Sequence, residues 1–275
     1  MMKKVWVVES IRYKKDGAVI TALHKDYKTE ETVFLPAEEF IREALKEKEI
    51  LDDEHWKKLK EDAAYFSAYR ECLRKLSIKD RTEKEILDIL YEQKGLTAEK
   101  RKEILVKLKK KNLVNDADYA ENRIGDLRMA LYGKNRIYRS LKEKGIEENL
   151  IREKLDSESP QKEVERGTEY ARRLESMLNS VPYREKKTRL KQKLMTHGYD
   201  SQDCDTIIAS ITVSKDDEKE ERLLEKAAES AYRRHSGKKE GRELKNAVIR
   251  LLLGKGFGYE DIMTVIGKME EQNES

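Results

Sequence analysis

A glycine that ends a helical apolar pattern recurs along the chain, and its spacing limits the possible folds more than any other feature. Gly145, Gly198 and Gly256 each follow a leucine by four residues, and Gly95 follows one by five. The intervals of 50, 53 and 58 residues suit units of three helices rather than single helices. Glycine ends helices because it adopts the left-handed conformation without a Cβ penalty. The sequence therefore predicts a tandem array of three-helix units.

The repeats and the changes in composition divide the 275 residues into five parts. The predicted fold class is mainly α, with three-helix modules in an elongated, curved array that follows a small β-hairpin or meander. A single three-helix unit buries little surface, so neighbouring units are expected to complete each core. The predicted parts are a strand-rich region over 1–50 and three-helix repeats over 51–115, 116–162, 163–214 and 215–275.

The first forty residues differ from the rest because they favour strands. Asp16-Gly17 predicts a type I′ hairpin turn, and Pro36 predicts the start of a helix over about 37–48. From Asp53 onward only helical periodicity is present, beginning with one apolar face from Trp56 to Leu76. The predicted strands are Val5–Val8, Ala18–Leu23 and Thr32–Leu35.

Several residues beside the recurring glycines are expected to define the repeat structurally. Thr82 and Glu85 form the sequence signature of a capping box, which begins a helix. Gly133 is predicted to end the helix that starts near Asp116. The full set of structural motif residues is Arg81, Thr82, Glu83, Glu85, Gly95, Asp116, Gly133, Gly145, Gly198 and Gly256.

The composition favours a cytoplasmic protein. Charged residues make up 41% of the chain, and no apolar run approaches the roughly 18 residues that a membrane span needs. The apolar stretch near Met1 is too short for a signal peptide. Cys72 and Cys204 lie 132 residues apart within apolar-periodic segments, which predicts two buried free thiols rather than a disulfide.

No group of residues favours catalysis, and we expect no catalytic residue, no cofactor and no metal site. The four histidines are isolated and lack the spacing of metal ligands. The segment Gly254–Gly258 lacks the residue order of a phosphate-binding loop and follows a helix instead of a strand. Glu83 and Glu85 fall in the first turn of a predicted helix, where carboxylates interact favourably with the helix dipole.

The net charge of +4 is unevenly distributed between the predicted units. Residues 63–115 carry 14 basic and 8 acidic side chains, net +6, and residues 164–214 carry 9 and 7, net +2. The other segments are close to neutral. Overall charge therefore does not argue for nucleic acid, but two units are locally basic.

Three groups of basic residues are candidates for binding a partner or DNA. Each could contact phosphates or an acidic protein surface, and the alternative for each is an ordinary solvated face. The third group lies on one helix, with Arg184, Lys187 and Lys191 beside its apolar face and the other three opposite. The candidates are Lys107, Lys109, Lys110 and Lys111; Lys134, Arg136 and Arg139; and Arg184, Lys186, Lys187, Arg189, Lys191 and Lys193.

Four short motifs follow one another in an order that resembles a known family. They are Arg81–Ile86 (RTEKEI), Leu113–Ala120 (LVNDADYA), Gly133–Ile137 (GKNRI) and Leu141–Ile146 (LKEKGI). Their order and spacing resemble those of the RecX family, the regulatory proteins of bacterial RecA recombinase. The resemblance is specific over about 63–156 and looser over 164–271, and the strand-rich start and fourth repeat resemble longer members.

The resemblance implies a non-enzymatic regulator that binds the RecA filament. Such a protein would modulate or inhibit recombination and ATPase activity in DNA repair and the SOS response. It would act as a cytoplasmic monomer, contact single- and double-stranded DNA within the filament, and have no membrane partner. One alternative is a helical DNA-binding protein that acts independently of RecA, because lysine clusters supply nonspecific phosphate affinity. Another is a scaffold without activity of its own.

Overall fold

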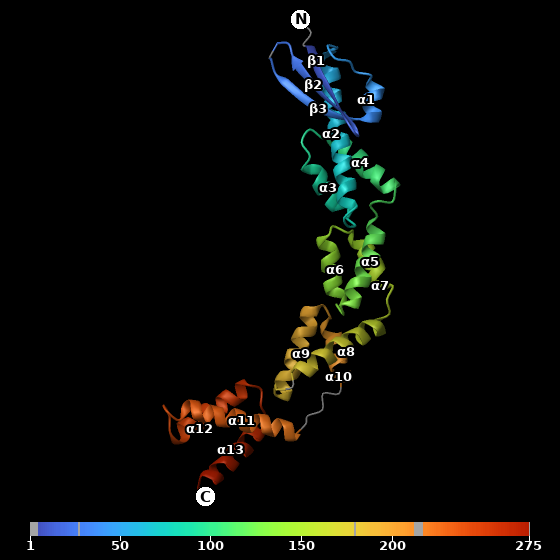
Figure 1. The fold of residues 1–275 in the computed structure, drawn as a ribbon. Helices are drawn as coiled ribbons and strands as arrows, with labels where there is room; N and C mark the ends of the chain where they lie inside the picture. The colour runs from blue at the N-terminus through green and yellow to red at the C-terminus, as the bar shows by residue number, and fades with distance from the viewer. Residues whose placement is uncertain (1–4, 27, 179, 212–216, 275) are drawn as a thin grey trace. The chain divides into compact units, whose positions relative to one another are not determined.

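The computed structural model describes residues 5–26, 28–178, 180–211 and 217–274. Within them the chain forms thirteen α-helices and one small antiparallel sheet at the N-terminus, which confirms the mainly α fold class (Figure 1). The chain divides into two compact units, residues 1–120 with 143–147 and residues 121–142 with 148–275. No helix in the described ranges combines the length and the apolar character needed to cross a bilayer.

The sheet has four strands in the order β3-β2-β1-β4, all antiparallel. The three predicted strands are present, and β1 extends beyond Val8 after a bulge between Val8 and Ser10. The fourth strand was not predicted because it has only three residues, which pair with Val5–Val7. The bounds are β1 (Val5–Lys14), β2 (Gly17–His24), β3 (Glu30–Pro36) and β4 (Ile50–Asp52).

The hairpin between β1 and β2 has a different turn from the predicted one. Lys14 pairs with Gly17, so the two loop residues are Lys15 and Asp16. A type I′ turn requires a positive φ at both central residues, and Lys15, Asp16 and Gly17 all lack one. Gly17 is needed for space, because a Cβ there would lie 2.9 Å from the Phe34 ring. The helix α1 is Ala37–Glu43 and ends earlier than predicted.

Helix α2 (Asp53–Leu76) contributes to two cores. Its first half packs against the sheet, where the rings of Trp56 and Trp6 stack with centroids 5.2 Å apart. Its second half places Tyr65 and Cys72 in the core shared with the following helices. At 100° per residue these two buried sets lie on nearly opposite faces. The predicted apolar face continues into the second core, where Phe66, Tyr69, Leu73 and Leu76 pack as partly buried residues. The prediction missed the fully buried residues on the other side of the helix.

The remaining helices follow in sets of three, which we call modules 1 (α2–α4), 2 (α5–α7), 3 (α8–α10) and 4 (α11–α13). The predicted boundary near 214 lies outside the described residues, and those near 115 and 162 stay predictions. The bounds are α3 (Glu83–Tyr91), α4 (Ala98–Lys110), α5 (Asp116–Met129), α6 (Lys134–Glu143), α7 (Glu148–Asp156), α8 (Pro160–Met177), α9 (Tyr183–His197), α10 (Ser201–Ser210), α11 (Asp217–His235), α12 (Gly241–Gly254) and α13 (Tyr259–Glu274).

The four recurring glycines all follow the middle helix of a module and all have a positive φ. The φ values are 75° at Gly95, 82° at Gly145, 106° at Gly198 and 93° at Gly256. The prediction that Gly133 ends a helix was wrong. Helix α5 ends at Met129, and the left-handed residue after it is Leu131, with a φ of 62°.

Both cysteines are free and completely buried, and we expect them to resist alkylation in the folded protein. Burial raises the pKa of the Cys72 thiol to about 11 and that of the Cys204 thiol to about 11, so neither forms the reactive thiolate at neutral pH. Mass spectrometry after iodoacetamide treatment should find no label on the native chain and two labels after guanidinium unfolding. Rapid native labelling would contradict the burial of Cys72 and Cys204.

Candidate functional site

The N-terminus of the middle helix of module 1 contacts the first residue of module 2 and the segment that follows the middle helix of module 2. The backbone N–H of Glu83, the first residue of α3, donates to Oδ1 of Asp116 at 2.8 Å. The hydroxyl of Thr82, a fully buried residue, donates to the carbonyl oxygen of Lys144 at 2.8 Å. The Lys144 ammonium pairs with Glu85 Oε1 at 2.8 Å. We call this set of contacts joint 1.

Gly145 allows joint 1 to close. A Cβ built on Gly145 would lie 2.6 Å from the Cβ of Lys84, closer than real Cβ atoms approach. The Lys84 ammonium donates to the carbonyl oxygen of Glu143 at 3.2 Å. Gly145 therefore has two reasons to be glycine, its left-handed φ and its contact with the start of α3.

The surroundings shift the pKa values of the two carboxylates of joint 1 in opposite directions. Burial raises the pKa of Asp116, and the hydrogen bond from the Glu83 backbone offsets only part of that effect. Burial also acts on Glu85, but the Lys144 ammonium and the Thr82 backbone N–H outweigh it and lower the pKa of Glu85. Both groups act as helix-capping carboxylates, since an anion is stabilised near a helix N-terminus.

The same arrangement recurs where module 2 meets module 3, and we call it joint 2. The backbone N–H of Lys134, the first residue of α6, donates to Oε1 of Glu163 at 2.7 Å. The N–H of Gly133 donates to the carbonyl oxygen of His197 at 3.1 Å, and that of Asn135 donates to the carbonyl oxygen of Gly198 at 3.0 Å. Joint 2 thus links two backbone segments directly.

Two glycines make this backbone contact possible. A Cβ on Gly133 would lie 2.5 Å from the backbone nitrogen of Tyr199. A Cβ on Gly198 would lie 2.5 Å from the Cβ of Arg136 and 2.6 Å from its backbone nitrogen. The function of Gly133 is therefore close approach at the start of α6, not the end of α5.

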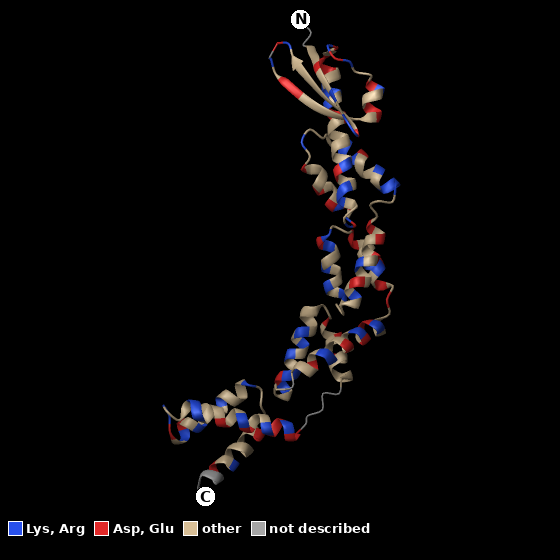
Figure 2. Ribbon diagram, viewed as in Figure 1, with Lys and Arg blue, Asp and Glu red and all other residues tan. Residues whose placement is uncertain are grey.

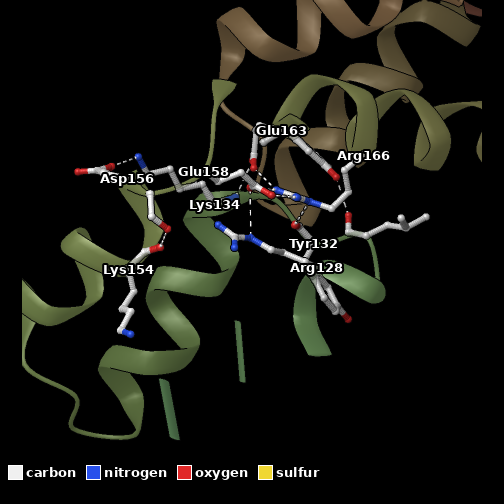
Figure 3. Close-up of polar contacts among 11 residues, drawn as sticks. Arg128, Tyr132, Lys134, Lys154, Asp156, Glu158, Glu163 and Arg166 are labelled. Atoms are coloured by element: carbon white, nitrogen blue, oxygen red, sulfur yellow. Dashed lines mark hydrogen bonds and ion pairs between the residues drawn. The ribbon is translucent and has the colours of Figure 1, made fainter. Parts of the chain in front are cut away.

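A buried ionic network supports Glu163 in joint 2 (Figure 3). The guanidinium of Arg166 donates twice to the Glu158 carboxylate, at 2.9 and 3.0 Å, and also donates to Glu163. Its Nε donates to the carbonyl oxygen of Tyr132 at 3.1 Å. Burial raises the pKa of Glu163, although the Lys134 backbone N–H and Arg166 act in the opposite direction. Arg166 therefore orients the carboxylate that caps α6.

Joint 3 repeats the pattern between modules 3 and 4. The backbone N–H of Tyr183, the first residue of α9, donates to the Glu220 carboxylate at 3.1 and 3.2 Å. A Cβ on Gly256 would lie 2.8 Å from the Cβ of Glu185. Each joint thus combines a carboxylate from the first helix of the downstream module with the glycine that follows its middle helix.

The candidate lysines of module 1 occupy different environments. Lys107 lies over the rings of Tyr65 and Tyr69, with Nζ 5.6 and 4.6 Å from the centroids, and Lys111 lies 5.9 Å from the Tyr69 centroid. Lys109 instead pairs with Glu83 at 2.5 Å, beside joint 1. Lys110 is exposed and has no ion-pair partner among the described residues.

Of the three candidates in module 2, Lys134 lies beside joint 2, and Arg136 and Arg139 are exposed. Lys134 pairs through its ammonium with Asp156, next to joint 2. The Arg136 guanidinium lies 6.0 Å from the centroid of the Tyr132 ring. Arg139 is exposed and donates to the carbonyl oxygen of Asn135 in its own helix at 3.2 Å.

In module 3, three of the six candidates form ion pairs with nearby acids. Lys186 reaches Glu175 at 3.0 Å and is only 12% exposed, so it does not lie on the solvated face opposite the apolar stripe as expected. The other two pairs are Arg189 with Glu185 at 2.7 Å and Lys191 with Asp205 at 2.6 Å.

The other three module 3 candidates have no ion-pair partner within the part of the chain that the structure describes. Lys187 lies 4.7 Å from the centroid of the Tyr183 ring. Arg184 and Lys193 are exposed. Figure 2 shows acidic residues interspersed with the basic ones on most helices, which explains why the sequence clusters did not identify the unpaired cations.

Sequence reasoning missed the acids Glu163 and Glu220 and the arginine Arg166. The carboxylates of joints 1, 2 and 3 precede the glycine of the same joint by 29, 35 and 36 residues. Because this spacing varies, aligning the repeats on their glycines does not place the three acids at one equivalent position. Arg81, a predicted motif residue, contacts the carbonyl oxygen of Lys75 at 3.5 Å and is not part of joint 1.

Comparison with known proteins connects this architecture to one family. The family description "RecX, second three-helix domain" matches residues 115–155, and "RecX, third three-helix domain" matches residues 218–266. The regulatory protein RecX of Streptococcus agalactiae serotype Ia is 32% identical over 193 residues, which cover 70% of this chain and 73% of that protein. The chain belongs to the RecX family. The regulatory protein RecX of Streptococcus mutans is 30% identical over 80% of this chain and 84% of its own length.

Two solved structures support the fold of the RecX family member described here. The crystal structure of RecX from Lactobacillus salivarius is 30% identical, has a TM-score of 0.51, and matches 55% of this chain and 98% of its own. A crystal structure of regulatory protein RecX has a TM-score of 0.57 at 24% identity and covers 74% of this chain and 99% of its own. The two matched RecX domains correspond to α5–α7 and α11–α13, with α8–α10 between them.

Proposed function

We propose that this RecX family member is a non-enzymatic, cytoplasmic regulator that binds RecA filaments and the DNA within them. Binding would modulate or inhibit the ATPase and recombination activities of RecA in DNA repair. Membership of a family whose relatives are named regulatory proteins carries this proposal.

The joints support binding to an extended partner. Each joint caps a middle helix through a backbone hydrogen bond to a carboxylate of the next module, so the chain offers several linked modules to a partner. Several weak contacts from linked modules give a high overall affinity, because the first contact raises the effective concentration of the next module. A filament offers repeated identical sites to such an array.

The distribution of cations supports a contact site on each of modules 1 to 3. Lys107, Arg136 and Lys187 each lie over a tyrosine ring and have no ion-pair partner in the described ranges. They retain their charge for a partner, whereas Lys109 and Lys134 are already engaged beside the joints. We propose the unpaired members of the three candidate groups as the residues that contact RecA or DNA.

An ATPase assay tests the proposal. RecA hydrolyses ATP on single-stranded DNA, and we expect the chain, added at substoichiometric to equimolar ratios, to change the steady-state rate. The effect should weaken as salt increases, because surface attraction between charged groups is screened. Gel filtration of the chain alone should give a monomer.

Two results would overturn the proposal. Binding to DNA with no change in RecA ATPase would favour a DNA-binding protein that acts independently of RecA. Absence of binding to both RecA filaments and DNA would favour a scaffold instead.

A further inference from the structure

Two lysines of α4 and Lys111, the C-cap residue of this helix, lie in one row. Lys100, Lys107 and Lys111 are separated by seven and four residues, which places them within an arc of about 40°. Their positions along the axis differ by about 10 and 6 Å. Lys100 was not among the sequence candidates, since it lies before the cluster at the end of the helix.

Two tyrosines of α2 form the base of this row. The rings of Tyr65 and Tyr69 lie nearly parallel, with centroids 6.4 Å apart and planes 10° apart. The ammonium groups lie over them, Lys100 at 5.1 Å from Tyr65, Lys107 at 4.6 Å from Tyr69 and Lys111 at 5.9 Å from Tyr69. Because an ammonium is attracted to the face of an aromatic ring, the tyrosines restrict where these flexible side chains place their charge.

The row is distinct from the rest of the lysine cluster. Lys109 points to Glu83 and belongs with joint 1. Lys100 also pairs with Asp62 at 3.5 Å and Glu103 at 3.7 Å, so one end of the row is partly neutralised. Lys107 and Lys111 have no carboxylate partner among the described residues and carry the unneutralised charge.

We propose that Lys107 and Lys111, with Lys100 at the end of the row, bind the phosphodiester backbone of a nucleic acid, and that Tyr69 positions them. This inference rests on the proposed function and assigns DNA contact within it to the α2–α4 face. An ammonium contacts phosphate oxygens as a point charge and needs no fixed approach direction, which suits successive phosphates along a row.

The composition of the row favours nucleic acid over an acidic protein. Protein interfaces are depleted in lysine and prefer arginine, whose planar fork matches a carboxylate. Interfaces with nucleic acids are much more positively charged. The row contains lysine alone, and the surrounding residues 63–115 have the highest net charge of the chain, +6.

The test measures binding of the full-length chain to fluorescent 30-nucleotide oligonucleotides, single-stranded and duplex, by anisotropy over a range of salt concentrations. We expect Lys107→Gln/Lys111→Gln to weaken binding about tenfold at low salt. For the single strand the salt slope should also fall by about 1.4, since each lost phosphate contact removes about 0.7. Comparing the two oligonucleotides identifies which form the row prefers.

A matched double variant controls for net charge. Lys94 and Lys102 are exposed and lie in the same module as the row. Lys102 lies about 160° away from Lys100 around the axis of α4. Lys94→Gln/Lys102→Gln removes the same two charges, and we expect it to change affinity less than twofold. An equal loss in both double variants would overturn the proposal, because bulk charge would then explain the binding.

The role of Tyr69 is tested by two variants that leave all lysines in place. Its hydroxyl is buried and unpaired among the described residues, so Tyr69→Phe should preserve binding. Tyr69→Leu keeps an apolar side chain but removes the ring, and we expect affinity to fall about threefold with an unchanged salt slope. Circular dichroism melting verifies that both variants fold. Wild-type affinity of a folded Tyr69→Leu variant would overturn its positioning role.

RecA ATPase, measured in parallel, separates this proposal from the proposed function. If Lys107→Gln/Lys111→Gln binds both oligonucleotides like wild type while regulation of RecA persists, the row is not a nucleic-acid site and the general function stands. If that variant instead loses binding to DNA-free RecA, the row contacts an acidic protein surface and the nucleic-acid proposal fails. If wild type binds oligonucleotides through the row but never affects RecA, only the proposed function fails.

Discussion

Gly198→Ala is expected to destabilise module 3 by about 3 kcal/mol, the largest effect of any single methyl group in the joints. The left-handed backbone alone costs an alanine about 1 kcal/mol or more. The added Cβ would also meet the Cβ and backbone nitrogen of Arg136 at 2.5 and 2.6 Å, and such overpacking adds about 1–3 kcal/mol. Hydrogen exchange of α9 and α10 should report a loss of protection of about 100-fold.

Gly95→Ala is the matched control for this prediction. Gly95 also has a positive φ, 75°, but its Cβ would meet only the side chain of Ala64, at 3.8 Å. We expect it to cost about 1 kcal/mol, from backbone conformation alone. Equal effects at the two glycines would mean that close approach across joint 2 contributes nothing to stability.

Glu163→Ala is expected to destabilise joint 2 by about 3 kcal/mol. The change removes the carboxylate that accepts from the Lys134 backbone N–H, and loss of such a cap costs about 1 kcal/mol. It also leaves the buried guanidinium of Arg166 with one carboxylate, that of Glu158, in place of two, and breaking a buried ion pair is strongly destabilising. Thermal unfolding followed by circular dichroism measures the loss.

Glu165→Ala provides the comparison on the same helix. Glu165 is exposed, so its removal should change stability by no more than about 0.5 kcal/mol. Glu163→Gln should lie between the two, since an amide oxygen can still accept the Lys134 hydrogen bond. If Glu163→Ala melts like Glu165→Ala, the network in Figure 3 is not a stabilising element.

The sequence predicted the helices and most of the strands well, because the patterns that begin and end these elements involve residues that are close together in the sequence. Gly145 and Gly198 follow helical apolar patterns, and Thr82 with Glu85 forms the capping box that the structure contains. The strand β4 escaped prediction because its three residues form no pattern without β1 beside them. The turn at Lys15 and Asp16 was misread because Gly17 serves packing against β3 rather than turn geometry.

The candidate site was less predictable because its contacts join distant residues. Lysines 107 and 109 look equivalent in sequence, yet a two-residue step rotates them by about 200°, toward Tyr69 in one case and Glu83 in the other. Glu163 resembles any acid in the first turn of a helix until Lys134 is brought beside it. Spacing within one helix contains no information about these partners.

All three joints have the same direction along the chain, and this affects how such an array can gain or lose modules. Every joint takes a helix N-terminus from the upstream module and a carboxylate and glycine from the downstream one. Modules 2 and 3 carry both halves, so an inserted copy of either would find a compatible neighbour at each end. Internal duplication could therefore lengthen the chain without new contacts having to evolve, and α8–α10 lies where such a duplication would fall, between the matched second and third RecX domains.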